Sequence, residues 1–153
     1  MKYYLKKTLL LMVTLMSFSL GNAQISDPVN WNTSVKKISD SEYELIATAT
    51  IEDGWHLYSQ QVSEGGPIAT TFNFESNKNY LKKGNTLEEE GHTVNDPIFE
   101  MQIKYFEDKV DFKQRIKLKS KAPFKINGTV EFMVCDDSRC LPPTEADLVF
   151  NIK

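Results

Sequence analysis

The chain has two cysteines, Cys135 and Cys140, and these are the residues best able to do chemistry. They lie in segment 134–143, where an alternating apolar stretch gives way to acidic residues, Ser and Arg, and then to Leu and two prolines. If the segment doubles back as a hairpin, facing residues have Cα atoms about 4.5–5.5 Å apart, a separation that a disulfide bond tolerates. The sequence therefore predicts that the two sulfurs are bridged.

A disulfide of this spacing is either a structural crosslink or a reversible redox couple. Closing a loop of about six residues stabilises a protein by only about 2 kcal/mol in the chain-entropy model. A domain of this length reaches ordinary stability without such a contribution. A short-loop disulfide at a surface turn is also open to reduction, because strain and solvent access favour thiol exchange. Spacing alone leaves both interpretations open.

The N-terminal segment predicts the compartment in which this disulfide works. Lys2, Lys6 and Lys7 precede an apolar run over residues 9–20, and small residues at 21 and 23 form a cleavage site. The run is shorter than the roughly 20 residues that a membrane-spanning helix needs. We expect residues 1–23 to be a signal peptide and residues 24–153 to be one exported, periplasmic domain, where disulfides persist.

The charge pattern disfavours nucleic acid as a partner. The whole chain has a net charge of −3, and removal of the lysine-bearing signal segment makes the remainder more acidic. Phosphate recognition needs clustered Lys and Arg, whereas the lysines here are scattered among acids. The nearest approach to a basic row, Lys117, Lys119 and Lys121, alternates with other residues and is typical of the solvated face of a strand.

Period-2 alternation of apolar and polar residues predicts an all-β domain. It occurs in segments 43–50, 72–74, 110–118, 130–134 and 148–152. Turn signals between them include Asp53-Gly54, Lys83-Gly84-Asn85 and Asn127-Gly128. Strands at this spacing favour a two-sheet β-sandwich of immunoglobulin-like architecture in a single domain.

The chain resembles the N-terminal periplasmic (alpha) domain of the DsbD thiol:disulfide interchange proteins. The resemblance covers essentially all of residues 24–153. The residues that carry it are Asp53 to Tyr58 with Gln60-Gln61, Gly66-Pro67 with Phe72, Tyr105-Phe106 with Val110 and Phe112, and Cys135 to Cys140 with Leu141-Pro142-Pro143. It implies an immunoglobulin-like sandwich whose cysteine pair carries electrons between proteins.

The resemblance also implies roles for individual residues. Cys140 corresponds to the cysteine that forms the mixed disulfide with partners, and Cys135 to the resolving thiol. Local charge agrees, because Arg139 adjoins Cys140 whereas acids adjoin Cys135. The site residues expected beside the pair are Phe99, then Ile98, as the shield in a cap loop that includes Asp96, and His56 and Tyr58 lining the site from one face of a strand.

These roles imply a component of a protein-disulfide reductase that needs no cofactor. Electrons would come from a membrane-embedded thiol reductase or a thioredoxin-like donor and pass to exported thioredoxin-like proteins. The family's membrane and thioredoxin-like domains do not occur in this sequence, so we expect separate proteins to supply them. We also expect a monomer.

Two other classes of function remain open from the sequence. One is a non-catalytic binding module of immunoglobulin-like fold with a structural disulfide. The other is a metal site built from the two cysteines with His56 and His92, which the wide spacing of the histidines disfavours.

Overall fold

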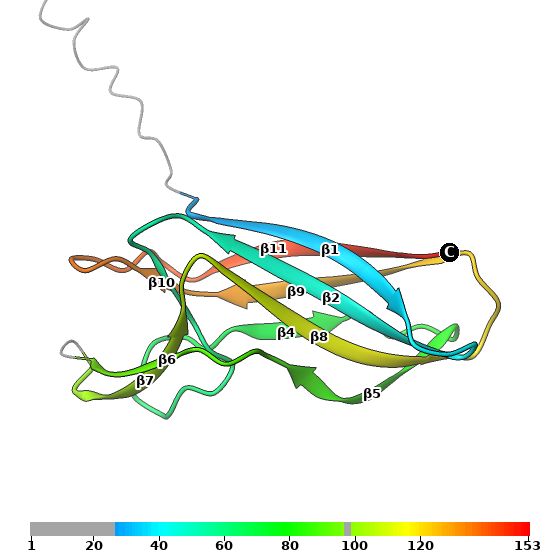
Figure 1. Cartoon of the computed structure of the whole chain (residues 1–153), viewed down its shortest axis with the longest axis horizontal. Coiled ribbons are helices and arrows are strands. Elements are labelled where there is room, and N and C mark those ends of the chain that lie inside the picture. Colours follow the sequence, from blue (N-terminus) through cyan, green and yellow to red (C-terminus); the bar gives the residue numbers. More distant parts are fainter. Residues whose placement is uncertain (1–26, 97–98) are drawn as a thin grey trace, which may run out of the picture.

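The computed structural model describes residues 27–96 and 99–153 and shows a domain built from β-strands (Figure 1). The predicted signal peptide and the predicted shield residue Ile98 lie outside these residues. In the described part, no helix has the length and apolar character needed to cross a membrane. The strands are β1 (Val29–Lys37), β2 (Glu42–Ile51), β3 (His56–Tyr58), β4 (Thr71–Phe74), β5 (Tyr80–Leu87), β6 (His92–Asp96), β7 (Met101–Phe106), β8 (Lys109–Leu118), β9 (Phe124–Phe132), β10 (Val134–Cys135) and β11 (Thr144–Ile152).

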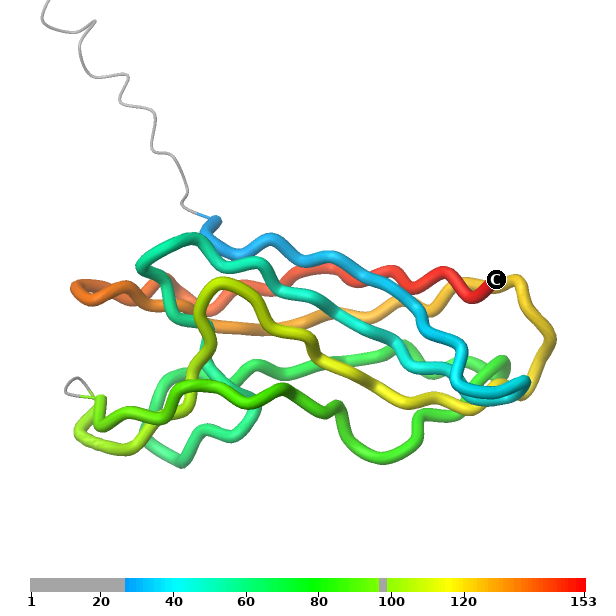
Figure 2. Tube along the Cα trace, viewed as in Figure 1, coloured from blue at the N-terminus to red at the C-terminus, as the bar shows by residue number. Residues whose placement is uncertain are grey.

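Two sheets form the layers of the sandwich, and a third lies at one end. The strand order β1-β2-β8-β5 makes one layer and β11-β9-β4 the other. Strands β10-β3-β7-β6 form the third sheet, at the left end of the molecule in Figures 1 and 2. The edges of the two layers meet where the Thr33 hydroxyl of β1 donates to the Val149 carbonyl of β11 (2.6 Å). The expected β-sandwich is therefore confirmed.

The core lies between the two layers and is built by the alternating strands. The apolar faces predicted in β2, β8, β9 and β11 are all buried, as Leu45, Phe112, Val130 and Phe150 illustrate. Aromatic rings join the layers, because Phe72 of β4 lies 4.9 Å from Phe112 of β8, measured between ring centroids. The alternation predicted these faces because each strand has one side in the core.

One buried polar residue on the β8 core face is fully paired. Gln114 is 1% exposed. Its Oε1 accepts from the Thr86 hydroxyl (3.0 Å), and its Nε2 donates to the carbonyls of Lys83 (3.1 Å) and Arg115 (2.8 Å). These bonds tie β5 to β8 and offset the desolvation of the amide.

Two of the predicted turns lie inside strands. Residues 127–128 belong to β9, where a Cβ on Gly128 would meet the Asn73 carbonyl oxygen at 2.6 Å. The glycine thus allows β4 to approach β9 closely instead of marking a turn. Residues 83–85 lie in β5, and Gly84, with a φ of 67°, is part of an irregularity in the pairing with β8. The Asp53-Gly54 turn is correct, with Gly54 at a φ of 78°.

The third sheet forms where the chain stops pairing with the two main layers, so that β3 pairs with other strands on both of its edges. The predicted strand through Val134 breaks at Met133, so that β9 pairs with β4 and β11 while β10 pairs with β3. Strand β3 pairs on its other side with β7, where Tyr58 faces Tyr105. The cysteines therefore extend from a small sheet at the end of the sandwich.

Candidate functional site

Cys135 and Cys140 are joined by a disulfide across a tight hairpin. The Leu141 N–H donates to the Val134 carbonyl and the Asp136 N–H to the Arg139 carbonyl, both at 2.9 Å. The two cysteines are therefore the non-hydrogen-bonded pair between these bonds, the arrangement that brings facing residues closest. Their Cα atoms lie 3.9 Å apart, which is closer than the sequence analysis expected.

The turn of this hairpin is organised by the Asp136 carboxylate. Its Oδ1 accepts hydrogen bonds from the hydroxyl and N–H of Ser138 and from the N–H of Arg139, each at 2.8 Å. The bonds from Ser138, then those from Arg139, lower the pKa of Asp136 to about 2. The carboxylate therefore stays ionised and holds the four-residue loop between the cysteines in one conformation.

Arg139 turns back toward the base of the hairpin. Its Nε lies 3.3 Å from Asp136 Oδ2, and its guanidinium carbon lies 5.6 Å from the centre of the Trp55 ring. Part of its charge is thus already paired with Asp136. The prediction that Arg139 favours a thiolate at Cys140 stays a prediction.

Cys135 and Cys140 differ in solvent exposure. Cys135 is 2% exposed and lies in a small cluster with Tyr58 and Ile103, separate from the main core. Cys140 packs against this cluster but is only partly buried. An incoming thiolate therefore reaches Cys140 more readily than Cys135.

A cavity of about 210 Å³ opens beside Cys135. It brings together four residues that the sequence analysis placed at the site: Cys135, His56, Tyr58 and Asp96. The other lining residues are Val94, Tyr105, Asp136 and Asp137. His56 and Tyr58 face the cavity while Trp55 and Leu57 lie in the main core, as the alternation predicted.

Tyr58 keeps its hydroxyl proton in this setting. Burial, then the charges of Asp96 and Tyr105, raises the pKa of Tyr58 to about 12. Its hydroxyl is therefore available as a hydrogen-bond donor next to the cysteines at any physiological pH.

Phe99 covers one side of the cysteine cluster. It packs against the cluster of Tyr58, Ile103 and Cys135, with its ring edge-on to Tyr58 at 6.4 Å between centroids. The Asp96 carboxylate accepts from the Phe99 N–H at 3.0 Å. Asp96 thus fixes the backbone of the residue predicted to be the shield.

Both histidines of the chain meet at Glu107. His56 Nε2 lies 3.0 Å from Glu107 Oε1, and His92 Nε2 lies 3.7 Å from Glu107 Oε2. The His56 ring also packs on Tyr105, with centroids 4.3 Å apart and planes tilted by 37°. His92 begins β6. No local sequence pattern pointed to Glu107 and Tyr105 as site residues, because cross-strand neighbours are distant in sequence.

A buried ion pair lies behind the cavity and links β3 to β7. The Glu88 side chain, 4% exposed, accepts from the Ser59 hydroxyl (2.5 Å), the Gln60 N–H (2.8 Å) and Lys104 Nζ (3.1 Å). Burial alone would raise the pKa of Glu88, but these hydrogen bonds and the Lys104 charge lower it.

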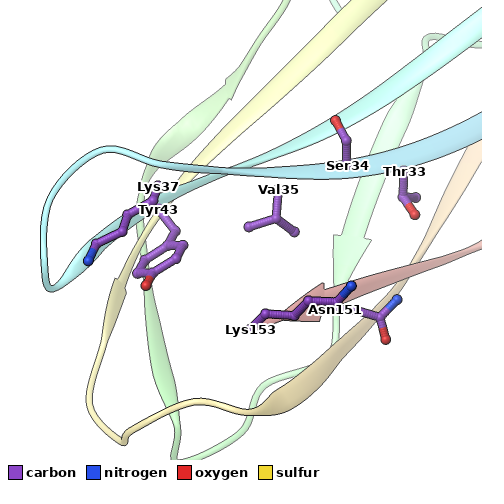
Figure 3. Close-up of a pocket in the computed structure, with 7 residues that line it drawn as sticks. All are labelled: Thr33, Ser34, Val35, Lys37, Tyr43, Asn151 and Lys153. Atoms are coloured by element: carbon purple, nitrogen blue, oxygen red, sulfur yellow. The ribbon is translucent and has the colours of Figure 1, made fainter.

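A second hollow lies at the opposite end of the sandwich (Figure 3). It measures about 400 Å³ and lies between the ends of β1 and β11. Its lining residues are Thr33, Ser34, Val35, Lys37, Tyr43, Asn151 and Lys153. No thiol or acidic side chain lines it, whereas Cys135 lines the smaller cavity.

We expect Phe99→Ala to expose the reduced cysteines. Burial slows thiol reactions, so removing the ring should raise the rate of alkylation by a small reagent by about tenfold with little loss of stability. Phe74→Ala is the matched control, because Phe74 is a partly buried phenylalanine that packs on the main core. Unchanged alkylation together with a large loss of stability would show that Phe99 is a core residue instead.

Comparisons with known proteins agree with the geometry. The family model of the N-terminal part of the thiol:disulfide interchange protein DsbD matches residues 25–151. No curated protein matches the sequence.

Three solved structures illustrate the shared fold. The reduced DsbD N-terminal domain of Neisseria meningitidis is 11% identical, with a TM-score of 0.51 over 79% of this chain and 84% of that chain. The N-terminal periplasmic domain of ScsB from Proteus mirabilis is 17% identical, with a TM-score of 0.54 over 79% and 44%. A complex between the DsbD and PilB N-terminal domains of Neisseria meningitidis matches at 10% identity, with a TM-score of 0.53 over 86% and 87%.

The structural matches confirm the immunoglobulin-like sandwich, and the family model covers nearly all of the described residues. The chain therefore belongs to the family of N-terminal domains of the DsbD thiol:disulfide interchange proteins.

Proposed function

We propose that this chain is a periplasmic thiol:disulfide interchange domain that carries electrons through Cys135 and Cys140. The donor is a membrane-embedded thiol reductase or a thioredoxin-like protein, and the acceptors are exported thioredoxin-like proteins. The observation that carries the proposal is the disulfide itself, which crosses a terminal hairpin with Cys135 buried and Cys140 only partly buried. Export depends on the predicted signal peptide at residues 1–23.

The exchange reaction balances without a cofactor. A thiolate of the donor attacks Cys140 Sγ, the bond between the two cysteines breaks, and Cys135 leaves with the bonding electron pair. The second donor thiol then attacks the mixed disulfide and releases Cys140. The donor dithiol has become a disulfide, and Cys135 and Cys140 are now the dithiol that can reduce an acceptor in the same way.

The setting of the hairpin supports a role in exchange more than a role as a crosslink. The disulfide joins residues of a hairpin at the end of the molecule, while most of the main core comes from β1, β2, β8, β9 and β11. The solved complex of a DsbD N-terminal domain with a PilB N-terminal domain shows that a related domain binds another protein. A protein partner at the accessible sulfur is consistent with this.

An equilibrium redox titration of the purified protein tests the proposal. We expect a reduction potential between those of thioredoxin and protein disulfide isomerase, about −270 to −180 mV. The reduced protein should keep its cooperative unfolding transition, because so short a loop constrains the unfolded chain little. A potential below about −300 mV, or unfolding on reduction, would favour the binding module with a structural disulfide.

A further inference from the structure

His56 lies directly across the third sheet from Cys135. In the antiparallel pairing of β10 with β3, Cys135 is opposite His56, and both residues line the 210 Å³ cavity. Directly opposed residues on one face of a sheet have Cβ atoms about 4.5–5.5 Å apart. The imidazole and the buried sulfur therefore lie on the same face of the sheet, at the same cavity.

The His56 ring is held in one orientation by two contacts. Its Nε2 lies 3.0 Å from Glu107 Oε1, and its ring packs on Tyr105 with the two ring planes tilted by 37°. The side chain is 22% exposed. With Nε2 engaged by the carboxylate, Nδ1 is the ring nitrogen left to exchange a proton. A thiol, an imidazole and a carboxylate that orients the imidazole form the arrangement that activates cysteine nucleophiles in other folds.

The Cys135 thiol requires a nearby group that can accept its proton and return it. As the resolving cysteine it must lose its proton before it attacks and regain it after it leaves. Because Cys135 is 2% exposed, bulk water has little access to the sulfur, and a buried thiolate is unfavourable without a nearby cation or donor. Imidazole takes up and releases protons near neutral pH, which suits it to both directions.

We propose that His56 is the proton acceptor and donor for Cys135, and that Glu107 is its positioning residue. This inference rests on the proposed exchange function. When a mixed disulfide at Cys140 resolves, the Cys135 thiol gives its proton to His56 and attacks Cys140 Sγ. The intramolecular disulfide forms, and the partner sulfur leaves as a thiolate with the electron pair of the broken bond. In the opposite direction, the imidazolium returns the proton to the departing Cys135 thiolate.

Several other groups that titrate or carry charge face this imidazole. Strand β6 contributes His92 and Asp96, β7 and the residue after it contribute Tyr105 and Glu107, β3 contributes Tyr58, and the cysteine hairpin contributes Asp136 and Asp137. His92 shares Glu107 with His56 but is 64% exposed and does not line the cavity. It therefore provides a matched control of the same residue type.

The test follows the reaction of the reduced protein with the aromatic disulfide dithiobis(nitrobenzoate), which releases a coloured thiol. Attack by Cys140 releases the first equivalent in a phase that depends on reagent concentration. Attack by Cys135 on the mixed disulfide releases the second in a unimolecular phase. We expect His56→Gln to slow the second phase by about a hundredfold near pH 7, the usual size of a general-base effect, while the first phase changes less than about twofold. The factor by which His56→Gln slows the second phase should change with pH. His92→Gln should leave both phases unchanged.

The outcomes separate this role from a structural one. A second phase unchanged in His56→Gln, slowed equally in His92→Gln, or slowed at every pH by the same factor would overturn the inference. If His56→Gln does not fold, Glu107→Gln replaces it, and should slow the second phase and shift its pH profile while leaving the imidazole in place; an unshifted profile would contradict the proposal. Because the probe is a small molecule, a negative result with His56→Gln does not affect the interpretation of the redox titration. A redox titration that contradicts the proposed function likewise does not invalidate the kinetic measurement.

Discussion

Cys135→Ser is expected to trap a covalent complex with an exported thioredoxin-like partner, whereas Cys140→Ser traps little. Exchange proceeds through a mixed disulfide, and removal of the resolving thiol leaves this intermediate without an internal escape route. The geometry favours Cys140 as the exchanging residue, because it is partly exposed while Cys135 is 2% exposed in a cluster with Tyr58 and Ile103. On non-reducing gels, we expect at least about tenfold more complex with Cys135→Ser.

The experiment uses each variant mixed with the same partner, whose accessible cysteine carries an activated disulfide. A double variant without either thiol is the control for non-covalent or adventitious complexes. Efficient trapping by Cys140→Ser alone would reverse the roles of the two sulfurs. If neither variant traps a partner, the domain is better explained as a binding module with a structural disulfide.

The strands that the sequence predicted are those with one face in the main core. Alternation identified β2, β8, β9 and β11 because a residue on their inner face is buried at every second position. Strand β5 was missed, since all but two of its side chains are exposed and it has no apolar period. Strands β3 and β10 have three and two residues, which is too short for periodicity alone to identify either as a separate strand.

The site was predictable only in part for a related reason. The cysteine hairpin could be proposed from the residues themselves and His56, Tyr58 and Asp96 from the family resemblance, and the structure places these residues around one cavity. Tyr105 and Glu107 reach the site through the pairing of β3 with β7, a long-range contact that no local pattern reveals. The pairing registers of the short strands β3 and β10 determine which side chains lie near the cysteines.

The run of three acids at residues 88–90 shows the same limit. Nothing in the sequence distinguishes the three acids, and Glu89 and Glu90 are exposed. Glu88 instead points inward and is 4% exposed, where it meets Lys104. The path of the chain between β5 and β6 determines which of the three acids points inward.

The Glu88–Lys104 ion pair stabilises the β3–β7 pairing that carries the site residues. The Ser59 N–H donates to the Lys104 carbonyl at 3.0 Å, which continues the β3–β7 pairing one step beyond Tyr58 and Tyr105. Glu88 then joins the side chains of Ser59 and Lys104. Tyr58 and Tyr105, which line the cavity, are thus each next in sequence to a residue of this polar network.

Glu88→Gln is therefore expected to lower the free energy of unfolding by about 2 kcal/mol near pH 7. The amide keeps the volume and part of the hydrogen bonding, but it leaves Lys104, whose side chain is only 24% exposed, without its counter-charge. Urea unfolding measures the change. Glu90→Gln, an exposed acid in the same segment, is the matched control and should differ from the natural protein by less than about 0.5 kcal/mol.

The pH dependence of this loss distinguishes a charge effect from a packing effect. The pKa of Glu88 in the folded protein lies below its ordinary value of 4.5, so the folded state binds its proton less tightly than the unfolded state does. Its contribution is fully present above about pH 5 and disappears as the pH falls through the lowered value. The difference between the natural protein and Glu88→Gln should therefore shrink when unfolding is repeated near pH 3. A difference that persists unchanged in acid would mean that the carboxylate charge is not what joins β3 to β7.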